Sequence, residues 1–294
     1  MTGRIIRGVG GFYFVHDGTA LYQCRAKGIF RKNHEKPLVG DRVEFSTVFD
    51  SEIENAGSID RILPRENRLI RPELANVGQI FLLFSGKSPA PNFDMLNRYL
   101  CLVHDTEIPV ALVVNKCDLC TEEELEEVRK AFCGSGYPMH MISVKDSTGI
   151  SGLREMMRGK LSCLAGPSGV GKSSLMNLLL GSKRMETGGL SRKIDRGKNT
   201  TRHSEVFYLG DESYLSDTPG FTSVEIGFIE KEDLDLYFNE FKPYLGSCRY
   251  LRSCAHIHEK ECAVKAAVKD GGISKIRYDS YVRIYENLAQ VRRY

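Results

Sequence analysis

One stretch of the sequence matches the pattern G-x-x-x-x-G-K-[ST], in which glycines, a lysine and a hydroxyl residue have fixed spacing. It consists of Gly166, Pro167, Ser168, Gly169, Val170, Gly171, Lys172 and Ser173. An apolar run (161–165) precedes it and a helical run beginning at Ser174 follows, which is the context that the pattern requires. Backbone N–H groups of such a loop curl around phosphates, the lysine reaches the β- and γ-phosphates, and the hydroxyl ligates Mg²⁺. Residues 166–174 are therefore predicted to bind a nucleotide, with Mg²⁺ on Ser173.

A second group of residues indicates which base the nucleotide carries. Asn115, Lys116, Cys117 and Asp118 form an N-K-x-D tetrapeptide directly after an apolar run (110–114). An aspartate at the end of a parallel strand can accept hydrogen bonds from both N1–H and the N2 amino group of guanine, and adenine lacks this donor pair. The tripeptide Ser143-Val144-Lys145 resembles the S-A-K element that supports guanine in GTPases. N-K-x-D alone is a weak signal, but beside a phosphate loop it favours GTP and GDP over ATP.

Two further segments have the residue types of nucleotide switches. Asp217-Thr218-Pro219-Gly220 matches D-x-x-G, in which Asp217 would hold Mg²⁺ through water and the Gly220 N–H would contact the γ-phosphate. The preceding segment 196–203 contains two threonines, Thr200 and Thr201. Either hydroxyl could complete the Mg²⁺ shell, and Thr201 is slightly favoured.

The order of these motifs is unusual. In ordinary GTPases the phosphate loop comes first and N-K-x-D and S-A-K come last. Here N-K-x-D (115–118) and S-x-K (143–145) precede the phosphate loop (166–173) and D-x-x-G (217–220). The set is complete, so the sequence predicts a circularly permuted GTPase domain whose second switch continues directly into the C-terminal region.

That C-terminal region contains a cluster of metal-ligand residues: Cys248, Cys254, His256 and Cys262. Three thiolates and one imidazole are typical of a closed structural zinc site. His258 is a competing imidazole, although a solvent-facing histidine is the simpler interpretation of it. The alternative for the whole cluster is three buried free thiols. Cys117 and Cys120 have the spacing of half a metal site but have no partner pair nearby, so we interpret them as incidental.

The elements that position these motifs suggest a multidomain α/β protein. Residues 1–68 contain five short strand-like runs separated by turn residues, the spacing of an OB-type β-barrel, a fold that often binds nucleic acid. From 69 to 227 apolar strands alternate with helical stretches, which predicts a parallel sheet. Residues 228–294 are predicted to form a helical, zinc-binding domain whose last helix covers 274–291.

Composition and charge exclude several classes of protein. The 294 residues are 41% hydrophobic and 27% charged, which rules out a wholly disordered or fibrous chain. Apolar runs are too short to span a membrane, and the first residues lack the apolar core of a signal peptide. We therefore expect a cytoplasmic protein with reduced cysteines. The net charge is only +3, but residues 242–294 hold 11 Lys and Arg against 5 Asp and Glu; charge alone does not distinguish a polyanion-binding face from a solvated helix.

Together the barrel, the permuted GTPase core and the C-x4/5-C-x-H-x5-C cluster resemble the RsgA (YjeQ/YloQ) family over nearly the whole chain. Three short segments are also similar to that family: Gly28-Ile29-Phe30-Arg31-Lys32, Pro37-Leu38-Val39-Gly40-Asp41 and Cys262-Ala263-Val264-Lys265. The resemblance implies a GTPase that binds the small (30S) ribosomal subunit and its 16S rRNA and assists late maturation. It also implies slow hydrolysis that the subunit stimulates. We expect a monomer.

The resemblance also bears on catalysis and RNA contact. Phe221 stands where many GTPases carry a water-orienting glutamine, and Asn199 stands where family members commonly have a histidine before the threonine pair. Asn199, with Thr201, is therefore the expected catalytic group, and His203 is an alternative. RNA contacts are expected from the barrel, near Phe30, and from the C-terminal end. The residues chosen are Arg25, Lys27, Arg31, Lys32, Lys275 and Arg277, with Arg283, Arg292 and Arg293 as further candidates.

Three functional hypotheses remain open at this point. The first is a ribosome-activated GTPase. The second is a checkpoint factor that binds rRNA and uses nucleotide mainly as a switch, with little turnover. The third is an ATP-dependent nucleic-acid enzyme, which Asp118 argues against.

Overall fold

The computed structural model describes residues 1–28, 30, 36–50, 53–70, 72–181, 205–217 and 224–290. The chain divides into two compact units. The first comprises Met1–Phe81, Ile150–Ala165 and Gly171–Gly220, and the second comprises Leu82–Gly149, Gly166–Val170 and Phe221–Tyr294. These units do not follow the division at 68 and 227 predicted from the sequence, which stays a prediction. Within the described residues, no helix combines the length and the apolar character needed to cross a membrane.

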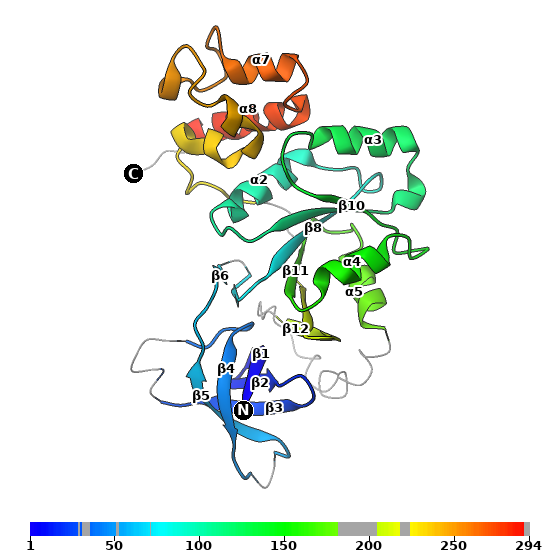
Figure 1. The fold of residues 1–294 in the computed structure, drawn as a ribbon, viewed down its shortest axis with the longest axis vertical. Coiled ribbons are helices and arrows are strands. Elements are labelled where there is room, and N and C mark those ends of the chain that lie inside the picture. Colours follow the sequence, from blue (N-terminus) through cyan, green and yellow to red (C-terminus); the bar gives the residue numbers. More distant parts are fainter. Residues whose placement is uncertain are drawn as a thin grey trace. The chain divides into compact units, whose positions relative to one another are not determined.

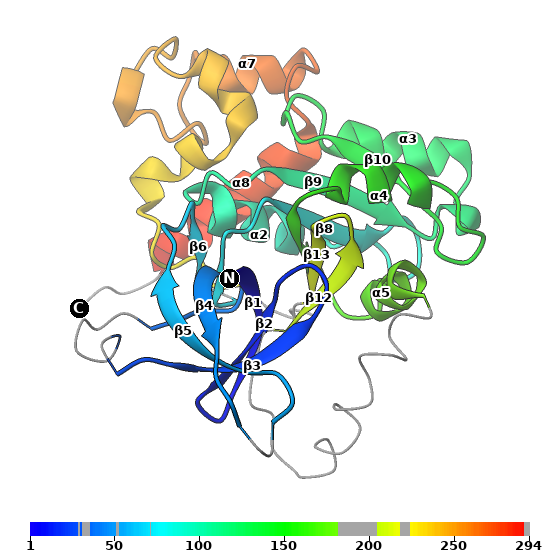
Figure 2. The same cartoon turned by 60° about the horizontal axis from the view of Figure 1, so that its bottom comes forward.

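The N-terminal strands close into a barrel, as predicted (Figures 1 and 2). Its strands follow the order β1-β2-β3-β5-β4, in which β3 and β5 pair in parallel and the other pairs are antiparallel. The strands are β1 (Thr2–Val9), β2 (Phe12–His16), β3 (Leu21–Ala26), β4 (Arg42–Thr47) and β5 (Ala56–Ile62). Alternate residues such as Val43 and Phe45 point inward to a closed apolar core, while the residues between them face outward. This order is that of an OB-type barrel.

A buried ion pair explains one of the family-like segments, Pro37 to Asp41. The Asp41 carboxylate is fully buried and accepts hydrogen bonds from the Leu38 N–H at 2.7 Å and from the Arg65 guanidinium at 2.7 and 2.8 Å. These bonds fix the corner that leads into β4. The segment therefore has a structural role in this chain.

The central sheet has the strand order β10-β9-β8-β11-β13-β12. Pairing is parallel between β10 and β9 and between β11 and β13, whereas β12 and β13 form an antiparallel edge hairpin. The strands of this sheet are β8 (Gln79–Ser85), β9 (Val110–Asn115), β10 (Met139–Met141), β11 (Leu161–Ala165), β12 (Glu205–Gly210) and β13 (Ser213–Asp217). A separate two-stranded sheet pairs β6 (Arg68–Leu69) with β7 (Leu74–Ala75). β8 and β11 are buried throughout, as expected for central strands covered on both faces.

Helices connect these strands. They are α2 (Phe93–His104), α3 (Glu122–Ala131), α4 (Ile150–Met157) and α5 (Lys172–Leu180). The start of α3 is specified locally by a capping box, because the Thr121 hydroxyl accepts from the Glu124 N–H and the Glu124 carboxylate accepts from the Thr121 N–H. This is the crossover pattern predicted from the alternation of apolar and helical stretches.

Beyond residue 224, part of the predicted helical structure consists of short 3₁₀ turns. These are η2 (Lys231–Tyr237), η3 (Asn239–Tyr244) and η4 (Leu251–Ser253), followed by α7 (Ala263–Lys269) and α8 (Lys275–Gln290); η1 (Cys117–Leu119) lies earlier in the chain. Pro243 lies inside η3 and limits how far an α-helix could extend there. The last helix agrees with the predicted range to within one residue at each end.

The prediction that Arg277 binds RNA was wrong. Its side chain is 1% exposed and its guanidinium donates to both carboxylate oxygens of Glu240, at 2.5 and 2.9 Å, and to Asn97 Oδ1 at 2.7 Å. Its Cζ also lies 4.6 Å from the centre of the Phe238 ring. Charge counting treats every arginine as a surface cation, whereas Arg277 lies on the buried face of α8 and joins α8 to α2 and η3.

In the first unit the edge hairpin contacts the barrel. His16 Nδ1 of β2 lies 3.2 Å from the Tyr214 hydroxyl of β13, and the Arg4 guanidinium of β1 lies 5.0 Å from the centre of the Tyr214 ring. Tyr208 of β12 packs against His16 with ring centres 4.4 Å apart. An aromatic and cationic cluster therefore connects the barrel to the strands on either side of the 211–212 turn.

Replacing Arg277 with alanine should strongly destabilise the protein. The change leaves the Glu240 carboxylate buried without its cation, which typically costs about 3–5 kcal/mol. Arg283→Ala is the matched control. Arg283 also lies on α8 and forms an ion pair, with Asp94 of α2, but its side chain is 51% exposed. That control should lose at most about 1 kcal/mol of unfolding free energy in urea titrations. Equal losses for the two variants would contradict the structural role assigned to Arg277.

Candidate nucleotide and metal sites

The phosphate-binding pattern forms a turn between β11 and α5. Gly166 has φ of +151°, and a Cβ atom there would lie 2.0 Å from the Leu83 carbonyl oxygen, so only glycine fits beside β8. Gly171 has φ of +101° and is the N-cap of α5. Left-handed glycines at such positions let the chain turn sharply and present N–H groups at the start of a helix, where anions bind. This geometry is typical of an anion-binding loop, and phosphate binding by these residues stays a prediction.

Asn115 connects the N-K-x-D loop and the 143–145 loop to the loop between β11 and α5. Its side chain is almost completely buried; Nδ2 donates to the Val170 carbonyl at 2.9 Å, and Oδ1 accepts from the Val144 N–H at 3.2 Å. Both ends of the carboxamide are therefore bound to backbone. Asn115 was predicted to bind nucleotide, and the structure gives it the role of holding three loops together.

Lys116 and Asp118 lie beside this connection. Lys116 has a left-handed backbone, with φ of +62°, and its ammonium donates to the carbonyls of Ser88 at 2.5 Å and Gly169 at 3.0 Å. The Asp118 Oδ1 accepts from the Ser143 hydroxyl at 2.8 Å, and Lys145 Nζ lies 3.9 Å from Oδ2. Ser143 thus orients the carboxylate, which retains lone pairs on both oxygens for further donors.

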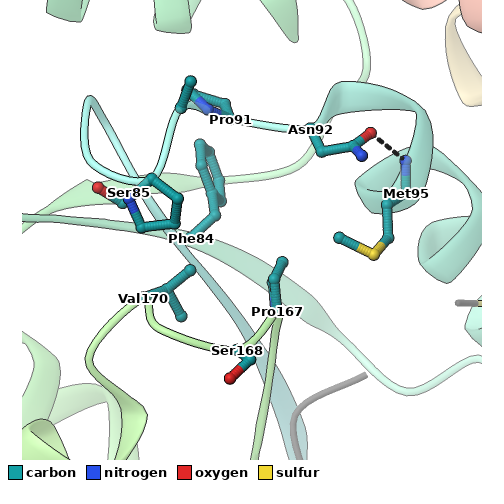
Figure 3. A pocket seen from close by; sticks show the side chains of 10 residues that line it. Phe84, Ser85, Pro91, Asn92, Met95, Pro167, Ser168 and Val170 are labelled. Atoms are coloured by element: carbon teal, nitrogen blue, oxygen red, sulfur yellow. Dashed lines mark hydrogen bonds between the residues drawn. The ribbon is translucent and has the colours of Figure 1, made fainter. Parts of the chain in front are cut away.

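An apolar cavity of about 280 Å³ adjoins the same loop (Figure 3). Its walls come from the end of β8, the proline-rich turn that follows it, the first turn of α2 and the phosphate loop. They are formed by Phe84, Ser85, Pro89, Ala90, Pro91, Asn92, Met95, Pro167, Ser168 and Val170. None of these ten residues is charged, so the cavity does not provide the cations that a triphosphate needs. It marks the apolar side of the phosphate loop.

The structure describes only part of the remaining switch and magnesium residues. Lys172 is buried, whereas Ser173 and Ser174 are exposed in the first turn of α5. Asp217 is the last residue of β13, next to Leu164 of β11. Asn199, Thr200, Thr201, His203, Gly220 and Phe221 lie outside the described residues, as do Arg31 and Lys32.

The structure brings the four predicted zinc ligands together in the second unit. Cys248, Cys254, His256 and Cys262 are all buried, and their ligand atoms lie within 4.8 Å of one another. The Cys248 and Cys262 sulfurs are 3.7 Å apart, and His256 Nδ1 lies 3.5 and 3.3 Å from them. Around a tetrahedral zinc ion, with Zn–S of about 2.3 Å and Zn–N of about 2.0 Å, two sulfurs are separated by about 3.8 Å and a sulfur and a nitrogen by about 3.5 Å. The donor set and its spacing fit zinc.

Backbone N–H groups favour the thiolate form of Cys248, whereas burial keeps the pKa of Cys254 and Cys262 above the ordinary value of a thiol. Burial alone would raise the pKa of the Cys248 thiol, but N–H groups of Ala263 and Val264 that point at its sulfur outweigh burial and lower the pKa. The Ala263 nitrogen lies 3.3 Å from Cys248 Sγ, and the Lys265 N–H donates to Cys262 Sγ at 3.5 Å. Burial raises the pKa of Cys254 to about 12 in the metal-free protein. A metal ion would have to displace that proton, since thiolate is the ligand form.

Sequence reasoning missed several residues around these sites. Ser88 anchors Lys116 through a backbone carbonyl, which no residue type can signal. Asp235 Oδ2 lies 3.4 Å from His256 Nε2, although 21 positions separate them in sequence. His258, the competing ligand, is exposed and is not part of the cluster.

The other predicted RNA contacts that the structure describes, Arg25, Lys27 and Lys275, are exposed cations. Arg25 lies over the Phe12 ring at 4.7 Å, Lys27 pairs with Asp60 at 2.7 Å, and Lys275 pairs with Asp279 at 2.7 Å.

The strand order, the glycine loop before α5 and the N-K-x-D loop after β9 define a P-loop GTPase core in circularly permuted order. The RsgA GTPase family model matches residues 62–227 and the RsgA N-terminal domain model matches residues 2–56. The chain therefore belongs to the RsgA family, as the motifs had suggested.

Full-length relatives and solved structures agree with this membership. Proteins named small ribosomal subunit biogenesis GTPase RsgA are 43% identical in Agathobacter rectalis, over all of both chains, and 43% identical in Clostridium perfringens, over 99% of each. The crystal structure of YjeQ from Thermotoga maritima is similar with a TM-score of 0.79 and 34% identity, covering 99% of each chain. That of YloQ, a circularly permuted GTPase, gives a TM-score of 0.77 and 33% identity, covering 100% of this chain and 96% of the other.

Metal content should distinguish the two nearby histidines. His256→Ala removes one of four clustered ligands and is expected to lower zinc binding at least about tenfold in a chromophoric chelator competition. His258→Ala removes an exposed imidazole only two positions away and should bind zinc like the unmodified chain. Loss of zinc in the His258 variant alone would overturn the ligand assignment.

Proposed function

We propose that the chain binds GTP and Mg²⁺, hydrolyses GTP to GDP and phosphate, and acts in maturation of the small ribosomal subunit. The observation that carries the proposal is the joining of an N-K-x-D loop to a phosphate loop by Asn115. The relatives that cover the whole chain are named small ribosomal subunit biogenesis GTPases, which supports the choice of partner.

The proposed nucleotide site divides its tasks among the loops. Asp118, oriented by Ser143, accepts the N1–H and N2 amino protons of guanine, and the 143–145 loop supports the base. Residues 166–174 bind the phosphates, with Lys172 at the β- and γ-phosphates. Ser173 and Thr201 ligate Mg²⁺, Asp217 holds it through water, and the Gly220 N–H contacts the γ-phosphate. When bound, Mg²⁺ neutralises charge that develops on the phosphate oxygens.

For catalysis we propose that Asn199 positions the attacking water. Phe221 follows D-x-x-G where a glutamine would otherwise orient water, and a phenyl ring cannot do so. An amide can accept from and donate to water, but it cannot take up a proton as imidazole does. Slow intrinsic turnover is the expected consequence, with stimulation by the ribosomal subunit.

We further propose that cationic side chains of the N-terminal region and of α8 bind 16S rRNA. The barrel would contribute Arg25, Lys27, Arg31 and Lys32, and α8 would contribute Lys275. Phosphate contacts of this kind position a protein on RNA. Phe30, near which these contacts were expected, is buried in the apolar core of the barrel and is not available to stack on a base. The protein is expected to act as a cytoplasmic monomer of three domains divided at 68 and 227, with one structural zinc ion.

Base specificity can be tested at Asp118. Asp118→Asn replaces an acceptor by a donor, which should weaken GTP binding by at least about tenfold and favour xanthosine triphosphate, whose C2 carbonyl accepts from the new amide. Asp211→Asn is the matched control, since Asp211 is an exposed acid in the turn between β12 and β13, outside all of the proposed nucleotide-binding segments. Fluorescent-nucleotide titrations measure both variants. Unchanged GTP affinity in the Asp118 variant would refute the guanine assignment.

Hydrolysis by the purified protein, with and without small ribosomal subunits, tests the whole proposal. Phosphate release from GTP that rises strongly with subunits, and not from ATP, is the expected result. Asn199→Ala should then lower the stimulated rate while leaving GTP affinity unchanged. GTP binding with no stimulation would instead favour the checkpoint factor, and equal use of ATP would favour the third hypothesis.

A further inference from the structure

The two ring nitrogens of His256 face different groups. Nδ1 points into the cysteine cluster, at 3.3 Å from Cys262 Sγ and 3.5 Å from Cys248 Sγ. Nε2 faces the Asp235 carboxylate at 3.4 Å, and the side chain is only 2% exposed. A neutral imidazole ligand has one nitrogen for the metal and carries its proton on the other. The cluster therefore requires the proton on Nε2, where Asp235 stands to accept it.

Asp235 comes from a separate element, η2, and not from the ligand loop. Its side chain is 21% exposed, so it keeps contact with solvent while it faces the ring. Tyrosines of α8 hold the backbone of the ligand loop instead: the Tyr278 and Tyr281 hydroxyls donate to the carbonyls of His256 and Ala255, at 2.7 and 2.9 Å. Among the contacts described for the cluster, the Asp235 carboxylate is the one that lies within hydrogen-bonding distance of the His256 ring.

We infer that Asp235 is a positioning residue of the metal centre: it accepts the Nε2 proton of His256 and so fixes the tautomer and orientation in which Nδ1 binds zinc. Carboxylates in this position raise the basicity of a ligating histidine, and their loss typically weakens metal binding about 10–100-fold. This inference concerns the zinc cluster and is independent of the proposed GTP hydrolysis.

The contact also makes η2 part of the metal centre. η2 begins at Lys231, soon after the D-x-x-G segment, whereas the ligands span 248–262. Within the second unit, the contact between Asp235 and His256 connects η2 to the ligand loop. Zinc binding should therefore order η2 as well as the loop that provides the ligands.

Zinc affinity of the full-length chain, measured by competition with a chromophoric chelator, tests the inference. Asp235→Ala should weaken zinc binding about 10–100-fold. Asp235→Asn keeps an oxygen acceptor for the Nε2 proton and should recover most of this loss. Asp233→Asn is the matched control, because Asp233 is an exposed acid of the same turn, and its affinity should equal that of the unmodified chain. Equal affinities of the Asp235→Ala variant and the unmodified chain would overturn the inference.

Two further readouts separate positioning from simple loss of structure. Cobalt-loaded Asp235→Asn should retain the visible absorption of a three-thiolate, one-imidazole site, whereas a misfolded loop would lose it. In the unmodified chain, amide hydrogen exchange of residues 231–237 should slow when zinc is added after chelation. If those amides exchange at the same rate with and without zinc, η2 is not coupled to the metal and the inference fails, even where Asp235→Ala is too unstable to purify.

Discussion

The carboxamide of Asn115 is the contact on which the geometry of the nucleotide loops depends. A side-chain amide can donate and accept at once, and here it donates to the loop that contains Val170 and accepts from the loop that contains Val144. Because Asn115 is 2% exposed, neither bond competes with water. The loop that contains Val144 and the loop that contains Val170 are thus held at a fixed spacing, although 55 positions separate Asn115 from Val170 in the sequence.

Buried polar groups organise the second unit at three places, each with a different chemistry. Asn115 joins loops through neutral hydrogen bonds. Arg277 joins α8 to η3 through a charged pair that is 1% exposed on both sides. The Cys3His cluster brings together positions 248–262 of the ligand loop, and the contact between His256 and Asp235 connects this loop to η2. Burial of such groups is costly without partners, so each place specifies one arrangement of the surrounding chain.

Much of this arrangement was predictable because the relevant signals are local. Strand alternation gave the barrel, and the glycine pattern identified the loop before α5; the ligand spacing identified the metal cluster. Local patterns contain no information about partners that meet only in the folded chain. Arg277 looked like any surface cation, Asp235 like any exposed acid, and Asn115 like a base contact. Their roles depend on Glu240, His256 and Val170, which are distant in sequence.

The burial of Arg277 has a consequence for how this lineage can exchange parts. A C-terminal segment acquired by recombination from a distant relative would bring its own α8 and η3, and therefore both Arg277 and Glu240. The guanidinium of its Arg277 would still have to contact Asn97 and Phe132 of the original chain, which lie far upstream in the sequence. A replacement C-terminal segment would therefore pack correctly only if its arginine matched the upstream Asn97 and Phe132.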